Sequence, residues 1–269
     1  MTDGPTLNES YGAALARLGL LRDAVSKSEY LEQKTWWVPE KWTLSEGFNY
    51  KGRSRRRPSG QLLDGLSRRR RFVESLAETE LTRRTVRQIV SEAGEDGERL
   101  VEAFIAVMAW GFPPRGLGPY RTSVMLSPAV GAPEPVDVLP QVVRELRESG
   151  PLAGYRELMK QLEGCGPAFG TKFLYFASED SDRAPILDDY VARWMSDKGV
   201  LGGDGRPVTS LRWDPSQYAT YLNFLGDASD KLGEPDVGLM EYVMFVDQQH
   251  RDYLMAGQSL PAWIRRVTQ

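Results

Sequence analysis

Residues 162–191 read LEGCGPAFGTKFLYFASEDSDRAPILDDYV, and the architecture of the chain can be argued from this stretch. Gly164 and Gly166 enclose a single residue between two apolar segments, a pattern typical of a tight turn between helices. Pro167 suits the first turn of the second helix, because that position needs no backbone N–H. The stretch therefore predicts two helices joined by a glycine hairpin, over residues 152–177.

A hairpin of this kind directs the N-terminal amides of its second helix outward. Unpaired amides, together with the helix dipole, can hold a phosphate without reading base sequence. We therefore expect Gly164, Gly166, Ala168 and Gly170 to form a DNA-binding surface, with Gly170 allowing the helices to pack closely. A simple packing corner between two helices is the alternative explanation.

An acidic pair, Asp188 and Asp189, follows the hairpin by about twenty residues and starts another helical pattern. Aspartate commonly caps a helix, so Asp188 could be only an N-cap. A carboxylate can also stabilise the positive charge of an oxocarbenium-like sugar, which makes Asp188 a candidate catalytic residue. Asp189 is better explained as a surface acid of the first helical turn.

Composition excludes several kinds of chemistry. Among 269 residues there is one cysteine, Cys165, and one histidine, His250. A four-cysteine cluster is impossible within one chain, and structural zinc and a Ser-His or Cys-His triad are disfavoured. No apolar run approaches a membrane span, and the N-terminus lacks a secretion signal, so we expect a cytoplasmic protein with no membrane partner.

Positive charge is concentrated although the net charge is −3. Residues 51–87 contain twelve basic and four acidic side chains. A localised basic strip suits a polyanion, although a solvated helix face would give the same pattern. The arginines that we expect to contact DNA are Arg55, Arg56, Arg57 and Arg68.

The remaining pattern is almost wholly helical. We expect helices over residues 8–33, 61–76, 82–93, 98–110, 136–148, 152–162, 169–177, 188–197, 214–232 and 236–254. We see no strand alternation and no repeat. Residues 1–60 would form an N-terminal helix with a Trp- and Arg-rich arm, and residues 61–269 a helical core.

The hairpin and acid together resemble the helix-hairpin-helix (HhH-GPD) superfamily of DNA glycosylases. Leu162, the hairpin glycines, Gly170 and the run Pro185-Ile186-Leu187-Asp188 occupy the places of its motif. The run from Thr171 to Ala177 is most similar to the bacterial branch with the 8-oxoguanine-glycosylase fold. The resemblance implies an all-α fold of roughly ten helices in two packed lobes, with the active site between them and Asp188 as its carboxylate.

One position departs from that pattern. Bifunctional members place a nucleophilic lysine two residues after the second hairpin glycine, where this chain has Ala168. Lys172 stands one helical turn later, from where it could reach the sugar or contact a phosphate. We expect a monofunctional reaction that uses water, because a lysine displaced by a turn misses attack distance.

A target base must leave the stack before it is cut, and aromatic side chains usually line the pocket that receives it. We expect Trp110, Phe112, Trp36 and Trp37 to serve there, although each could belong to the hydrophobic core. We expect no metal and no cofactor, except that hairpin carbonyls could hold a monovalent cation.

The leading hypothesis is an enzyme that excises a modified base from double-stranded DNA and leaves an abasic site. The resemblance extends to antiphage glycosylases, which favours a hypermodified phage cytosine, such as alpha-glucosyl-hydroxymethylcytosine, over repair of 8-oxoguanine. The rivals are a non-catalytic DNA-binding module and a helical interaction protein. No protein partner is evident.

Overall fold

The computed structural model describes residues 7–23, 25, 27–35, 37–44, 46–52, 58–112, 117–179, 183–201 and 213–255. They belong to two compact units, unit 1 within residues 1–30 and 183–269 and unit 2 within residues 31–182. Unit 1 thus draws on both ends of the chain, whereas unit 2 is continuous. The boundary that the sequence predicted after residue 60 stays a prediction.

The all-α prediction is confirmed. The described residues contain a single sheet, in which β1 (Phe48–Asn49) pairs antiparallel with β2 (Leu62–Leu63), and two 3₁₀ turns, η1 (Pro39–Lys41) and η2 (Ser67–Arg69). The α-helices are α1 (Leu7–Arg22), α2 (Lys27–Leu31), α3 (Arg70–Leu76), α4 (Arg83–Ala93), α5 (Gly97–Gly111), α6 (Gly118–Leu126), α7 (Pro135–Ser149), α8 (Pro151–Gln161), α9 (Pro167–Ala177), α10 (Asp189–Asp197), α11 (Pro215–Leu232) and α12 (Val237–Met255). None of these helices is long and apolar enough to cross a membrane.

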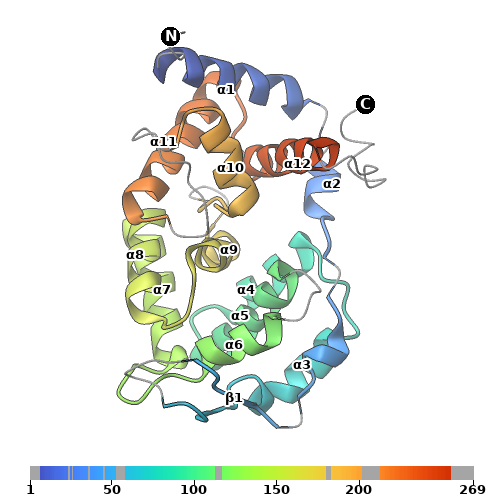
Figure 1. Ribbon diagram of the computed structural model, residues 1–269, viewed down its shortest axis with the longest axis vertical. Helices are drawn as coiled ribbons and strands as arrows, with labels where there is room; N and C mark the ends of the chain where they lie inside the picture. Colours follow the sequence, from blue (N-terminus) through green and yellow to red (C-terminus); the bar gives the residue numbers. More distant parts are fainter. Residues whose placement is uncertain are drawn as a thin grey trace. The chain divides into compact units, whose positions relative to one another are not determined.

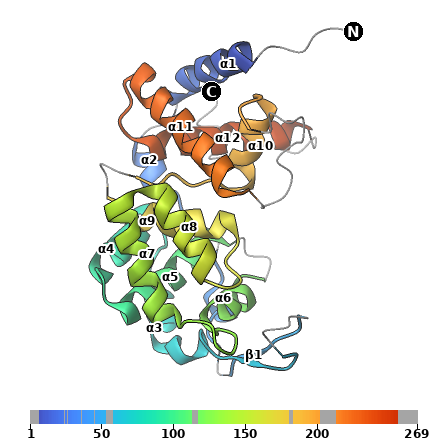
Figure 2. The same cartoon turned by 90° about the vertical axis from the view of Figure 1, so that its left-hand side faces the viewer.

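Unit 2 is built around α5. This helix contacts α3, α4, α6, α7 and α9, and all its residues from Val101 to Trp110 except Glu102 are buried. A helix that is apolar all round needs cover on every side, which its neighbours supply. Figure 2 shows α4, α5, α7, α8 and α9 gathered in this unit. The hairpin helices α8 and α9 therefore stand on a packed core.

Unit 1 packs α12 against α1, α10 and α11 (Figure 1). Asp214 caps α11 by accepting hydrogen bonds from the amides of Ser216 and Gln217. Gly233 ends that helix in the left-handed conformation, with φ +64°. Helix α10 lies on α12, so Asp188, the N-cap residue just before α10, adjoins a supported helix.

The predicted helix over residues 61–76 is wrong in its first half. Residues 62–63 pair as a strand, and the α-helix begins only at Arg70. Gly65 explains the difference, since its amide donates to the Ser127 hydroxyl at 2.9 Å and a Cβ there would lie 2.4 Å from the Leu126 carbonyl oxygen. Close approach to a distant segment overrides the local helical pattern.

Two further expectations need correction. The helix predicted over residues 8–33 is divided into α1 and α2. Helix α6 was not predicted at all, because its first turn contains Gly118 and Pro119, which resemble a loop in isolation. Proline is in fact acceptable there, since it needs no hydrogen-bonded N–H at the start of a helix.

Candidate functional site

The predicted hairpin is present in unit 2. Helix α8 ends at Gln161, α9 begins at Pro167, and the Cys165 amide donates to the Leu162 carbonyl at 3.2 Å. Gly164 has φ +83°, a conformation that favours glycine. Gly166 has φ −82°, which other residues also adopt, so of the two hairpin glycines Gly164 alone needs the conformational freedom of glycine.

Close packing of the hairpin helices depends on small residues. A Cβ on Gly170 would lie 2.5 Å from Met159 Cε, and one on Gly154 would lie 3.0 Å from Leu146 Cβ. Gly170 therefore lets α9 approach α8, as expected, and Gly154 does the same for α8 on α7. This packing fixes the direction in which α9 presents its first turn.

The start of α9 is suited to an external anion. Its N-cap, Gly166, offers no side-chain cap, and Pro167 occupies the first helical position. The Gly166 carbonyl accepts from the amides of Phe169 and Gly170 at 3.0 and 2.9 Å. Ala168 is buried at the second position, where amides of uncapped helices meet phosphate. Burial raises the pKa of the Cys165 thiol to about 12, so the hairpin holds no thiolate near neutral pH.

Lys172 is not a surface lysine. Only 7% of its surface is exposed, and its Nζ lies 5.8 Å from the centre of the Phe169 ring. Its aliphatic stem runs against Gly111, where a Cβ would come within 2.8 Å of Lys172 Cδ. Phe169 also stacks on Phe112, with ring centres 3.9 Å apart. Lys172 thus packs within an aromatic cluster at the end of α5.

The predicted base-pocket residues lie in different environments. Trp110 is 3% exposed, donates from Nε1 to the Gln33 carbonyl at 3.2 Å and meets Phe176 edge to face. Phe112 belongs to the stack with Phe169, and Trp37 is half-buried. Trp36 lies outside the described residues. The base-pocket role of these four side chains stays a prediction.

The basic strip is more neutralised than its composition indicates. Arg55, Arg56 and Arg57 lie outside the described residues, and Arg68 pairs with Asp64 at 2.8 Å. Arg69, Arg70 and Arg84 also pair with acids. Arg83 is 1% exposed and lies over the rings of Trp110 and Tyr175, so its guanidinium is not presented at the surface.

In unit 1, Asp188 caps α10 as expected. Its Oδ1 accepts hydrogen bonds from the amides of Tyr190 at 3.0 Å and Val191 at 3.2 Å. The side chain is half-exposed at the end of a fully buried segment, residues 183–187. Asp189 is the first-turn acid that the sequence predicted, paired with Arg193 at 3.1 Å.

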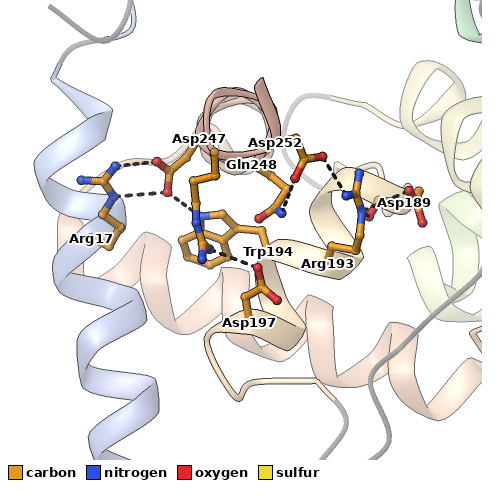
Figure 3. Close-up of polar contacts among 9 residues, drawn as sticks. Arg17, Asp189, Arg193, Trp194, Asp197, Asp247, Gln248 and Asp252 are labelled. Carbon is orange, nitrogen blue, oxygen red and sulfur yellow. Dashed lines mark hydrogen bonds and ion pairs between the residues drawn. The ribbon is translucent and has the colours of Figure 1, made fainter. Parts of the chain in front are cut away.

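A polar network holds α10 on α12 (Figure 3). Arg193 also pairs with Asp252 at 2.7 Å, to which Gln248 donates at 3.1 Å. At the next position of α10, the indole Nε1 of Trp194 donates to Asp247 at 2.9 Å, and Arg17 of α1 pairs with the same carboxylate. These bonds fix α10, and with it the residue that caps it.

Asp247 is a buried carboxylate that remains acidic. Burial opposes its ionisation, but hydrogen bonds from Arg17 and Trp194 outweigh that effect, so the pKa of Asp247 lies below its ordinary value. No local pattern distinguishes Asp247 in the sequence, because its partners come from α1 and α10, far away in the chain.

Two buried tyrosines of α11 also form hydrogen bonds that the sequence did not indicate. Tyr218 donates to the Pro185 carbonyl at 3.2 Å and Tyr221 to the Ile186 carbonyl at 2.8 Å. Their spacing of three residues on one helix face is the only sequence signal of this shared task. The described residues contain no group of three or more His, Cys, Asp or Glu side chains that could hold a metal ion.

An all-α fold with an uncapped helix-hairpin-helix in one unit and an aspartate-capped helix in the other is consistent with a helix-hairpin-helix protein of the DNA glycosylase class. A family model described as "Putative 8-oxoguanine DNA glycosylase OGG-like protein" matches residues 28–245, and the chain belongs to that family. Its substrate is accordingly DNA. No curated protein and no solved structure gives a match.

Proposed function

We propose that this DNA glycosylase hydrolyses the N-glycosidic bond of a modified base, with Asp188 as its catalytic carboxylate. The base is flipped out, the bond to C1′ breaks, and the bonding electrons leave with the base. Water then bonds to C1′ and gives up a proton. Asp188 stabilises the oxocarbenium-like sugar and accepts that proton.

The hairpin has a separate task in this proposal. The uncapped start of α9 binds a phosphate of the DNA backbone, so it supplies affinity and register without base specificity. The positive φ of Gly164 and the close packing at Gly170 support this role, since both fix the direction of the first-turn amides.

The catalytic assignment rests on the two hydrogen bonds that the Asp188 carboxylate accepts from the first turn of α10. Two backbone amides bind one carboxylate oxygen at 3.0 and 3.2 Å, which orients the group before substrate arrives. Catalysis by electrostatic stabilisation depends on such prior orientation.

A monofunctional reaction is favoured by the surroundings of Lys172. A nucleophilic amine must approach C1′, whereas this side chain is 7% exposed and packs on Gly111 and Phe169. Reduction with borohydride during turnover tests this point. We expect no covalent DNA adduct, and an adduct lost on Lys172→Gln would show that the enzyme is bifunctional.

For the substrate we favour a hypermodified phage cytosine, such as alpha-glucosyl-hydroxymethylcytosine, and hence a role in antiphage defence. The Trp- and Arg-rich N-terminal third supports this choice, because stacking and hydrogen-bonding side chains there suit a bulky, polar base. Repair of 8-oxoguanine is the second candidate, and the description of the family favours it.

The test compares duplexes that carry 8-oxoguanine with DNA that carries glucosylated hydroxymethylcytosine, and it measures alkali-labile abasic sites. Asp188→Asn should lower excision roughly 100- to 10,000-fold, yet it should keep the fold because asparagine caps helices equally well. Asp189→Asn is the matched control and should retain activity. DNA binding without abasic product from any duplex would instead identify a non-catalytic binding module.

A further inference from the structure

The segment that leads to Asp188 is buried yet irregular. Residues 183–187 lie below the surface and belong to no helix or strand. Buried backbone carbonyls outside regular structure need partners from elsewhere, since an unpaired one is costly. The donors that meet this need determine how firmly the segment, and the residue at its end, are held.

Two of those donors come from one face of α11. The hydroxyl of Tyr221 donates to the Ile186 carbonyl at 2.8 Å, and that of Tyr218 donates to the Pro185 carbonyl at 3.2 Å. Both side chains are 0% exposed, and their ring centres lie 6.2 Å apart. Two adjacent carbonyls are thus held by two rigid side chains, and Leu187 alone separates them from Asp188.

The upstream end of the segment is held as well. Arg183 is 8% exposed and donates from Nη1 to the Tyr30 hydroxyl at 3.1 Å. The same nitrogen lies 3.5 Å from a carboxylate oxygen of Asp236. The segment is therefore fastened at its start by a buried arginine and near its end by the two tyrosines.

We propose that Tyr218 and Tyr221 are positioning residues for Asp188, acting through the Pro185 and Ile186 carbonyls. The inference rests on the proposed catalytic role of Asp188. Capping bonds orient the carboxylate relative to α10, and the tyrosine bonds fix the backbone that enters it. Loss of the hydroxyls lets this backbone shift, and a displacement on the order of 1 Å is enough to lower a reaction rate by about 100-fold.

The experiment removes hydroxyls and keeps the rings. Tyr221→Phe, Tyr218→Phe and the double variant are compared with Tyr11→Phe. Tyr11 belongs to α1, and its hydroxyl donates at 2.7 Å to Asp227 of α11. The control therefore removes a tyrosine hydroxyl that bonds to α11 rather than to the segment before Asp188. Single-turnover excision and affinity are measured on duplexes with 8-oxoguanine and on DNA with glucosylated hydroxymethylcytosine.

We expect the double variant to excise the base about 10- to 100-fold more slowly, with DNA affinity within about twofold of the wild type. Added to Asp188→Asn, the tyrosine changes should lower the rate no further, because they act through that carboxylate. Rates equal to those of Tyr11→Phe, or full additivity with Asp188→Asn, would overturn the inference. If the double variant does not fold, the single variants carry the same comparison.

A second readout needs no catalysis. Hydrogen exchange of the Tyr190 and Val191 amides, measured by NMR, reports the bonds that these amides make to Asp188. Exchange should be faster in Tyr221→Phe than in Tyr11→Phe, and equal rates would contradict the positioning role. If wild-type protein forms no abasic sites, the proposed function fails, while faster exchange would still support the positioning of residue 188.

Discussion

The hairpin of α8 and α9 and the α10 platform (residues 183–197) are held in place by different kinds of contact. The hairpin is shaped by small residues that let apolar helices touch, with Gly170 and Gly154 at the closest approaches. The platform is held by directional polar bonds, from Asp247 to Trp194 and from Arg193 to Asp189 and Asp252. The first turn of any helix exposes unpaired backbone amides, so the hairpin needs no further bonds to orient them. A side-chain carboxylate can rotate, so hydrogen bonds must hold it in one orientation. The hairpin therefore depends on close packing of small residues, whereas the position of Asp188 depends on hydrogen bonds and ion pairs around α10.

Replacing Asp247 should cause the largest loss of stability. Its side chain is 1% exposed, and Asp247→Ala removes the partner of the buried Trp194 Nε1. We expect a cost of about 3 kcal/mol in the free energy of unfolding, measured with urea. Asp252→Ala is the control, since its carboxylate is 30% exposed and its loss should cost at most about 1 kcal/mol. Equal losses in the two variants would show that burial of the network does not matter.

Substitution within the hairpin should have a smaller effect. Gly164→Ala places a side chain at φ +83° and within 3.0 Å of Val124 Cγ1, and we expect it to cost about 1–2 kcal/mol. Gly166→Ala should change stability by less than about 0.5 kcal/mol, because φ is −82° and no atom lies within 4 Å of its Cβ. Thermal unfolding checks both values. If the hairpin binds phosphate, Gly166→Ala should nevertheless weaken DNA binding, and unchanged affinity would count against that role.

Acid should weaken the α10 platform through Asp247. The pKa of Asp247 in the folded protein lies below its ordinary value, because hydrogen bonds from Arg17 and Trp194 outweigh the cost of burial. Its contribution to stability is therefore present above the ordinary pKa of 3.8 and is lost as the pH falls through the lower, folded pKa. Asp247→Asn should flatten the decline in stability below about pH 4, as measured by urea unfolding at a series of pH values. A wild-type profile that matches the variant would contradict this assignment.

Features set by neighbouring residues were predictable from the sequence. The turn at Gly164, the place of Pro167 in the first turn of α9 and the cap at Asp188 each depend on a few adjacent positions, and the structure confirms them. The catalytic and DNA-binding roles of those residues stay predictions. Local signals indicate where a helix begins, but not what its side chains contact.

Features set by contacts between distant segments were missed. Arg83 was counted in a surface strip, yet it is buried against Trp110 and Tyr175, whose positions depend on the packing of α4, α5 and α9. The bonds from Tyr218 and Tyr221 to Pro185 and Ile186 join residues more than thirty positions apart. Neither propensity nor periodicity carries such information, because many sequences with the same pattern would bury these rings without aligning a hydroxyl.

The division of the chain also sets an order of assembly. Unit 2 is one continuous stretch, so all its residues have been synthesised once residue 182 is added to the chain. Unit 1 instead combines α1 with helices from the C-terminal part of the chain. During synthesis, which proceeds from the N-terminus, the hairpin of α8 and α9 can fold before α12, which supports α10, has been made. A chain that stops before α12 would then contain the complete hairpin but lack the helix on which α10 packs.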